Sequence, residues 1–507
     1  MQSLKKFAKK EALSAEEMYA LELNCSMLGI SSQQLMENAG SSIAHFISEK
    51  FKQAKKLLFF CGTGNNGGDG FAAARMLGSS YEIKIIVVGR EIKSDPALLN
   101  FSYISSTPFV KLSYYDEMDA HEIDLSIKES DLIIDAIFGT GFRGELKGIF
   151  KDAVEKINSS GKKVVAIDLP TGIGSKTCVN ANYTVTFHNE KTVAKGLKNV
   201  IVKDIGIPLD AELFTGPGDL YLASKPTNAY VNKRDRGIAL IIGGSSIYHS
   251  APVHSLISAS ATIALRSGAG YSILFTPQSI TNAVRSISQN QIVKPLGKNF
   301  ITFSKSLMNE IDRANAIAIG MGISKNIQAQ QACRKIVSYA LSVGKKIIVD
   351  ADGIIAIKDI VAKGKPGSLL IVPHDAEFYT FSGIKLEHES ASTLYERTIA
   401  AKRIAELKGI TVLLKGHNTV IASNSKIKIN RASTPNLATM GSGDVLSGII
   451  AGFAASGSDL FEAAAAGAYL HSKIGELLNI KKGNHIIARD IAEHIPEVLK
   501  EFDMVVT

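Results

Sequence analysis

Three acidic residues in the N-terminal half lie where apolar runs end or glycine-rich turns begin. Asp69 lies in GTGNNGGDG (62–70), Asp135 in LIIDA (132–136), and Asp168 directly follows VVAI. The carboxyl ends of parallel strands meet at one edge of an open sheet, where small ligands bind. A carboxylate in a dry pocket there can take a proton from a ligand and return it. The simpler alternative for each acid is that it caps the following turn or helix.

The glycine-rich segment connects an apolar run at 57–62 to a helical pattern at 70–77. Glycine lets the backbone approach a ligand closely, and free N–H groups at a helix start favour a phosphate. A carboxylate at Asp69 repels phosphate, however, and suits a ribose hydroxyl better. An ordinary tight turn is the alternative, although the NNGGDG string is more particular than a single GxG.

A second candidate centre lies at GSGD (441–444), ahead of a helical pattern rich in small residues. Successive N–H groups at a helix start can bind a transferring phosphoryl group, and Asp444 can accept the proton of an attacking hydroxyl. In LLKGHNT (413–419), Lys415 ends an apolar run and the residues after it can bind other phosphates or a ribose. The alternative is a glycine-rich helix start with an acid in its first turn.

Two series of apolar runs alternate with helical patterns, which favours parallel sheets covered by helices on both faces. The periodicity lapses at 215–237, which we predict to link a domain of residues 1–214 to a domain of residues 238–507. The fold class is therefore α/β in both halves. The predicted strands are 57–62, 83–89, 132–139, 163–170 and 183–187, then 238–244, 271–277, 316–322, 346–352, 369–374 and 411–416.

Composition excludes several classes of protein. The 507 residues are 45% hydrophobic and 21% charged, with a net charge of +9. The basic residues form no dense stripe and tryptophan is absent, so we expect no nucleic-acid partner. The four cysteines are far apart and form no CxxC pair, which argues against a disulfide framework or structural zinc. No apolar run reaches ~18 residues and no secretory signal stands at the N-terminus, so we expect no membrane partner and a cytoplasmic location.

The N-terminal motifs resemble the epimerase domain of bifunctional NAD(P)H-hydrate repair enzymes. The matching pieces are LMENAG (35–40), GTGNNGGDG (62–70), DAIFGTGFRGE (135–145), AIDLPTG (166–172), TVTF (184–187) and VKDIGIP (202–208). The resemblance implies a Rossmann-like α/β/α sandwich that interconverts the R and S hydrates of NADH and NADPH (NADHX and NADPHX).

By that resemblance, Asp168 lies at the reacting centre, and Asn66, Asp135 and Thr171 help to hold potassium. The family more often has serine where Thr171 stands, and threonine keeps the hydroxyl. The residues implied to bind the hydrated dinucleotide are Asn65, Asn66, Gly67, Gly68, Asp69, Gly139, Thr140, Gly141, Phe142, Arg143, Gly144, Glu145 and Asp168.

The C-terminal motifs resemble the ADP- or ATP-dependent NAD(P)H-hydrate dehydratase domain, which has a ribokinase-like α/β fold. The pieces are residues 238–277, IGMG (319–322), DADGI (350–354), IVPHDAEFY (371–379), LLKGHNT (413–419) and ATMGSGDVLSGIIAG (438–452). The resemblance implies phosphorylation of the S hydrate and elimination of phosphate, with Asp444 as the catalytic base. Ala251, Gly322, His374 and Asp444 are implied to face the hydrated cofactor, and Lys415, Gly416, His417, Asn418, Thr419 and Gly443 to bind the nucleotide.

Two departures from the dehydratase pattern stand near these residues. The usual PHPGE is PHDAE here, so Asp375 and Ala376 replace a proline and a glycine, while His374 and Glu377 remain. Met440 replaces one glycine of the usual pair before the GD element. Neither departure removes a catalytic group, but each alters contacts expected near the substrate.

The two halves together predict one repair enzyme that uses NADHX or NADPHX and ADP or ATP, with potassium and magnesium as cofactors. The sequence does not decide between the two hydrates or between the two nucleotides. The resemblance also implies a homo-oligomer, since members of the family commonly assemble as one, and the small-residue helices near the C-terminus could pack closely between subunits. The alternative is a ribokinase-like small-alcohol kinase with a non-catalytic dinucleotide-binding N-terminal domain.

Overall fold

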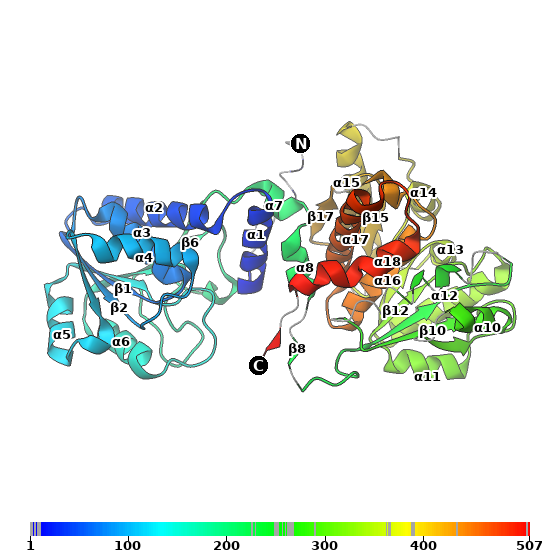
Figure 1. Ribbon diagram of the computed structural model, residues 1–507, viewed down its shortest axis with the longest axis horizontal. Coiled ribbons are helices and arrows are strands. Elements are labelled where there is room, and N and C mark those ends of the chain that lie inside the picture. The colour runs from blue at the N-terminus through cyan, green and yellow to red at the C-terminus, as the bar shows by residue number, and fades with distance from the viewer. Residues whose placement is uncertain are drawn as a thin grey trace. The chain divides into compact units, whose positions relative to one another are not determined.

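The computed structural model describes residues 4, 7, 12–224, 227–228, 230–247, 253–255, 257–258, 260, 268–287, 291–360, 362, 367–386, 391–431, 434–502 and 505–506 (Figure 1). The chain divides into two compact units. The N-terminal unit is Lys10–Pro208, and the C-terminal unit is Leu209–Thr507 together with Met1–Lys9. Each unit is built around its own sheet, so each is described by itself.

The N-terminal unit contains a seven-stranded parallel sheet in the order β3-β2-β1-β4-β5-β6-β7. This is a doubly wound order. The chain adds strands first to one side of β1 and then, from β4 on, to the other side, and such sheets bind ligands at this switch point. The strands predicted from apolar runs are confirmed, whereas β3 and β7 were not predicted. The strands are β1 (Lys56–Cys61), β2 (Glu82–Val87), β3 (Val110–Tyr114), β4 (Leu132–Ala136), β5 (Lys163–Ile167), β6 (Tyr183–Phe187) and β7 (Val200–Lys203).

Six helices of the N-terminal unit connect or cover these strands. Ser14 and Ser31 each begin a helix with a capping box, and Gly29, at φ +84°, stands where the first of these two helices has ended. A Cβ on Gly40 would lie 2.5 Å from Ala72 Cβ, so this glycine lets α2 and α3 approach closely. The helices are α1 (Ala15–Met27), α2 (Ser32–Lys50), α3 (Asn65–Leu77), α4 (Asp95–Ser106), α5 (Ala120–Glu129) and α6 (Gly148–Ser159).

The C-terminal unit contains a nine-stranded sheet in the order β11-β10-β9-β12-β13-β14-β15-β16-β17. The first seven strands are parallel in the same doubly wound order, and β16 and β17 add an antiparallel edge. The six predicted strands are confirmed, and β11, β16 and β17 were not predicted. The strands are β9 (Ile238–Ile242), β10 (Tyr271–Thr276), β11 (Ile292–Pro295), β12 (Ala316–Ile319), β13 (Lys346–Val349), β14 (Leu369–Ile371), β15 (Thr411–Leu414), β16 (Thr419–Ala422) and β17 (Ile427–Asn430).

Helix α16 (Ser442–Ala455) is buried along nearly its whole length and packs against β9, β12 and α17 (Leu460–Lys482). A Cβ on Gly467 would lie 2.7 Å from Ile450 Cγ1, so the small residues serve packing inside this unit. The other helices are α7 (Leu209–Leu213), α8 (Pro217–Ala223), α10 (Gln278–Ile287), α11 (Lys305–Arg313), α12 (Ile327–Ser342), α13 (Asp352–Ala356), α14 (Asp375–Ser382), α15 (Ala391–Lys408) and α18 (Ala488–Leu499). A separate two-stranded sheet pairs β8 (Thr227–Asn228) with β18 (Val505–Val506).

The predicted α/β class is confirmed by the two parallel sheets. Among the described residues, no helix combines the length and the apolar character that crossing a bilayer requires. Cys25, Cys61, Cys178 and Cys333 are free thiols.

Candidate active sites

Asp168 lies at the C-terminal edge of the N-terminal sheet, directly after β5, and is 7% exposed. Its φ of +63° is in the left-handed region, which aspartate tolerates better than most residues. The backbone N–H of Thr140 donates to Oδ2 at 2.9 Å, and the Thr186 hydroxyl donates to Oδ1 at 3.2 Å. The carboxylate is therefore fixed from two directions at the edge where ligands bind.

Lys191 is the cationic partner of Asp168. Its Nζ lies 3.6 Å from Asp168 Oδ1, and its side chain is 2% exposed. The same Nζ donates to Thr186 Oγ1 at 3.1 Å and to the carbonyls of Phe187 and Asn189 at 2.8 and 3.0 Å. Burial lowers the pKa of Lys191, and the charge of Asp168 opposes that shift.

Gly139 brings two predicted site residues together. A Cβ on this glycine would lie 2.5 Å from Asp168 Oδ2 and 3.1 Å from Asn66 Oδ1. The side-chain oxygen and nitrogen of Asn66 are buried, and the described part of the chain offers neither a hydrogen-bond partner. Such a buried amide is the kind of group that an absent ion or water satisfies.

Asp135 and Thr171 form a second buried pair beside this loop. The Thr171 hydroxyl donates to Asp135 Oδ1 at 2.6 Å, and the Thr171 N–H donates to Oδ2 at 2.8 Å. The N–H of Phe138 donates to the same hydroxyl at 3.0 Å. Burial raises the pKa of Asp135 to about 6, although the hydrogen bonds from Thr171 oppose the shift.

Close packing alone requires glycines in the turn at the start of α3. A Cβ on Gly67 would lie 1.9 Å from the Gly62 carbonyl oxygen, and one on Gly68 would lie 2.5 Å from Met36 Cε. Asn65 is exposed at the first position of α3. Burial raises the pKa of Asp69, and the nearby charges of Asp168 and Glu22 add to the shift.

A cavity of about 260 Å³ opens beside Thr140 and Lys191, two of the residues that contact Asp168. It is lined by the start of α1, by the loop that holds Thr140, Phe142, Arg143 and Gly144, and by Lys191. Arg143 is held across it, because its guanidinium donates to Glu16 Oε1 at 2.7 Å and to two carbonyls of its own loop. Gly141 and Glu145, two further residues predicted in this loop, do not line the cavity. Glu145 Oε2 accepts a hydrogen bond from the Lys176 N–H at 3.1 Å.

In the C-terminal unit, Asp444 stands in the first turn of α16, which begins after Gly441 at φ +86°. Asp444 is 8% exposed, and its Oδ2 hydrogen-bonds the Nδ1 of His254. Burial raises the pKa of Asp444, and the hydrogen bond from His254 opposes that shift. The hydrogen bond to Asp444 raises the pKa of His254 in turn.

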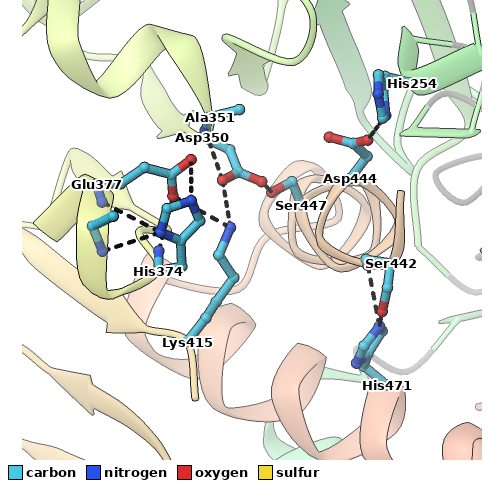
Figure 2. Close-up of polar contacts among 11 residues, drawn as sticks. His254, Asp350, Ala351, His374, Glu377, Lys415, Ser442, Asp444, Ser447 and His471 are labelled. Atoms are coloured by element: carbon cyan, nitrogen blue, oxygen red, sulfur yellow. Dashed lines mark hydrogen bonds and ion pairs between the residues drawn. The ribbon is translucent and has the colours of Figure 1, made fainter. Parts of the chain in front are cut away.

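A buried ionic network lies beside the same helix (Figure 2). Lys415, just after β15, donates from Nζ to Asp350 Oδ1 at 2.8 Å, and this Nζ lies 3.8 Å from Glu377 Oε2. The Ser447 hydroxyl of α16 donates to Asp350 Oδ2 at 2.7 Å. A Cβ on Gly443 would lie 3.3 Å from Lys415 Nζ, so this glycine lets α16 approach the network.

His374 begins α14 as its N-cap. Its Nδ1 accepts from the N–H groups of Ala376 and Glu377 at 3.2 and 3.3 Å, and its Nε2 lies 3.3 Å from Glu377 Oε1. The neighbouring Asp375, which departs from the family pattern, accepts from the guanidinium of Arg397 at 2.6 Å. Arg397 is 2% exposed and also donates to the Lys415 carbonyl, so the departure has a specific partner inside the fold.

The other predicted residues of this unit lie around these groups. Gly416, His417 and Asn418 form the turn between β15 and β16, which Thr419 closes by donating to the Gly416 carbonyl at 3.2 Å. Gly322, at φ +65°, lies in the loop after β12. The prediction for Ala251 lies outside the described residues.

Comparison with known proteins gives both halves a family. The model for the YjeF-related protein N-terminus matches residues 32–193, and the model for NAD(P)H-hydrate dehydratase matches residues 239–497. The bifunctional NAD(P)H-hydrate repair enzyme Nnr of Pyrobaculum aerophilum is 33% identical, over 97% of this chain and 99% of its own. The corresponding enzyme of Archaeoglobus fulgidus is also 33% identical, over 96% and 98%.

The chain belongs to the bifunctional NAD(P)H-hydrate repair family. Among solved structures, the ADP/ATP-dependent NAD(P)H-hydrate dehydratase of Bacillus subtilis, co-crystallised with ATP and Mg²⁺, is 25% identical over 56% of this chain and 96% of its own, with a TM-score of 0.47.

Three residues of this repair-family chain were missed by sequence reasoning. Asp350 directly follows strand β13, so it could have been predicted from the same pattern, an acid at the end of an apolar run, that identified Asp135 and Asp168. Lys191 follows β6 in a short loop, and His254 lies 190 residues from Asp444 in the chain. For those two only the folded chain shows the partner.

Proposed function

We propose that this chain epimerises the R and S hydrates of NADH and NADPH and dehydrates the S epimer with consumption of ADP or ATP. The observation that carries the proposal is the presence of two separate buried carboxylates, Asp168 and Asp444, at ligand-binding positions of two doubly wound units. Full-length likeness to repair enzymes supports it over a small-alcohol kinase, since both halves are matched.

In the N-terminal unit, Asp168 is the group that takes and returns a proton. Epimerisation at C6 of the hydrated ring requires either loss and return of hydroxide or ring opening, and a fixed carboxylate assists both. Lys191 helps to hold this carboxylate in place, because its Nζ lies 3.6 Å from Asp168 Oδ1 and donates to the Thr186 hydroxyl, which bonds to the same oxygen. The adjoining cavity, with Phe142 and Arg143 in its lining, receives part of the hydrated dinucleotide.

Potassium is the cation we propose for this unit. The donor set fits it, because the Asn66 oxygen is buried without a partner among the described residues, and Asp135 is a buried carboxylate beside the Thr171 hydroxyl. Oxygen ligands of this kind suit a hard cation. The cation would supply positive charge that organises the glycine loop. Asn66, Asp135 and Thr171 would hold it.

In the C-terminal unit, Asp444 accepts the proton of the hydrate's hydroxyl as that oxygen attacks the terminal phosphorus of the nucleotide. The bond from that phosphorus to the leaving nucleotide, ADP from ATP or AMP from ADP, breaks as the ester forms. Inorganic phosphate then leaves C6 and a proton leaves C5, which restores the dihydropyridine. The N–H of Gly443 at the start of α16 would stabilise the transferring phosphoryl group, whereas the N–H of Ser442 donates to the Thr439 carbonyl at 3.2 Å. Lys415 supplies positive charge next to Gly443.

Magnesium enters this proposal as the companion of the nucleotide phosphates. Nowhere in the described ranges do three His, Cys, Asp or Glu side chains gather as a ready metal site. The nucleotide would therefore supply much of the coordination, as is usual for Mg²⁺. Homo-oligomer formation stays a prediction, although the small residues of α16 and α17 that suggested it are largely buried within the unit.

The test is recovery of reduced nicotinamide absorbance from mixed R- and S-NADHX with magnesium, potassium and either ADP or ATP. Complete recovery requires both activities and identifies the nucleotide. Recovery that stops when the S epimer is consumed would leave the dehydratase and remove the epimerase. No recovery with either nucleotide would overturn the whole proposal.

A further inference from the structure

Helix α16 makes three polar contacts that leave it in different directions (Figure 2). Ser442 bonds to His471 of α17, Ser447 donates to Asp350, and Asp444 bonds to His254. The first two join α16 to neighbouring elements. The third joins the proposed catalytic carboxylate to a histidine that no sequence pattern had singled out.

The geometry of this pair differs from that of an acid used for capping. An aspartate in the first turn of a helix commonly accepts bonds from backbone N–H groups, but α16 has no side-chain cap. Asp444 Oδ2 is bonded to His254, whereas no residue in the described ranges is hydrogen-bonded to Oδ1. His254 is largely buried, with its side chain 19% exposed, so its imidazole is confined to this contact.

We propose that His254 is a positioning residue for the dehydratase reaction, donating from Nδ1 to Asp444 Oδ2 so that Oδ1 faces the substrate hydroxyl. The inference rests on the proposed function of Asp444 and deepens it. In the reaction, the hydroxyl proton goes to Asp444 Oδ1 as the new P–O bond forms and the bond to the nucleotide's leaving group breaks. His254 keeps its proton and orients Asp444, as the third group does in sites where a nucleophile is activated by a base and the base is oriented by another residue.

The pair also sets the pH at which the base works. A donor to a carboxylate favours its ionised form and so lowers its pKa, in opposition to burial. Loss of the donor should therefore move the acid limb of kcat/KM to higher pH. The charged groups that face this pair are Asp350, Asp352 and Lys415, in addition to the two residues themselves.

The test compares His254→Leu, His254→Asn and His254→Gln in the full chain, with S-NADHX and the preferred nucleotide. Asparagine places an amide donor near the Nδ1 position, whereas glutamine places it near Nε2 and leucine has none. We expect kcat to fall ~10- to 100-fold in His254→Leu with little change in KM, and the acid limb to rise by about one pH unit. His254→Asn should keep most of the wild-type kcat and an acid limb close to that of the wild type, and His254→Gln should keep less of the kcat and show a larger shift.

The chain supplies its own controls. Epimerisation by the N-terminal unit should be unchanged in every His254 variant, and His485→Leu should leave both activities as in the wild type, because His485 is exposed elsewhere in the C-terminal unit. Equal losses in the three variants with an unshifted acid limb would overturn the inference. If His254→Leu fails to fold, equal losses in His254→Asn and His254→Gln with an unshifted acid limb would overturn it as well. Absence of dehydration by the wild-type chain would instead remove the proposed function and this inference with it.

Discussion

The two units have parallel strands in the same order but position their acids differently. In the N-terminal unit, Asp135 and Asp168 stand at the ends of neighbouring strands β4 and β5. In the C-terminal unit the corresponding edge carries Asp350, which is bonded to Lys415 and Ser447, while the proposed base Asp444 comes from helix α16. The same sheet topology therefore supports two chemistries, because different elements bring the reacting carboxylate to the switch point.

The partners of the two proposed catalytic acids also differ. Asp168 has a buried lysine, and Asp444 has a histidine. The lysine Nζ is held by two backbone carbonyls and by Thr186, so it joins Asp168 to a fixed polar cluster. The histidine is the single side chain among the described residues that is bonded to Asp444, so it can orient a base that gains a proton once in each turnover.

The largest expected effect separates the two acids. Asp168→Asn should reduce epimerisation by ~10²- to 10⁴-fold and leave dehydration of pure S-NADHX intact, whereas Asp444→Asn should do the reverse. Separate assays of R-to-S exchange and of ATP- or ADP-dependent recovery measure the two rates. Asp359→Asn is the matched control, because Asp359 is an exposed acid paired with Arg334. Loss of both activities in either variant would mean that the two sites are not independent.

The next effect tests the lysine–histidine difference. Lys191→Met leaves Asp168 without its cation and Thr186 without a donor, so it should lower epimerisation by ~10- to 100-fold, measured as the rate of R-to-S exchange. Lys195→Met in the same loop is the control, since Lys195 is exposed. A folded Lys191→Met variant with an unchanged rate of epimerisation would assign the lysine to packing alone.

A third prediction concerns the contributions that His471 and Glu22 make to stability, which should depend on pH in opposite directions. Burial lowers the pKa of His471 to about 4, below its unfolded value, so the C-terminal unit should lose up to about 3 kcal/mol as pH falls from about 6.5 to 4. Burial raises the pKa of Glu22 to about 7, so the N-terminal unit should instead gain stability as pH falls through the range from about 7 to 4.5.

Thermal unfolding of the full chain across this pH range, with hydrogen exchange to assign each transition, measures both trends. His471→Gln stays neutral and can keep a bond to Ser442, so it should flatten the response of the C-terminal unit only. A response of the C-terminal unit in His471→Gln that is the same as in the wild-type chain would contradict the assignment of His471.

The smallest expected effect concerns Met440, one of the two departures from the family pattern. Its side chain is 70% exposed, so Met440→Gly should change kcat and KM of the dehydratase less than about twofold and stability by under ~1 kcal/mol. Steady-state kinetics with S-NADHX and a melting curve are sufficient. A tenfold change in KM would show that this side chain contacts the substrate.

Long apolar runs allowed most of the parallel strands to be predicted from the sequence, together with the acids at their ends. The missed strands β3, β7, β11, β16 and β17 have only four or five residues and lie at or near the sheet edges, so their hydrophobic pattern is weak. The partners of the acids were harder to predict. Lys191 and His254 acquire their roles from contacts that only the folded chain makes. His254 lies within the segment 238–277 that resembles the dehydratase domain, but nothing in that segment pairs it with Asp444.

The left-handed backbone at Asp168 limits what this position can become. Most residues with a Cβ would add ~1–2 kcal/mol of strain at this φ, whereas asparagine and glycine are tolerated. An alanine variant would therefore mix a folding penalty with a chemical one. For the same reason, a descendant of this domain that lost its epimerase chemistry but kept its fold should carry asparagine or glycine here, which makes position 168 a marker for silent copies in genomes.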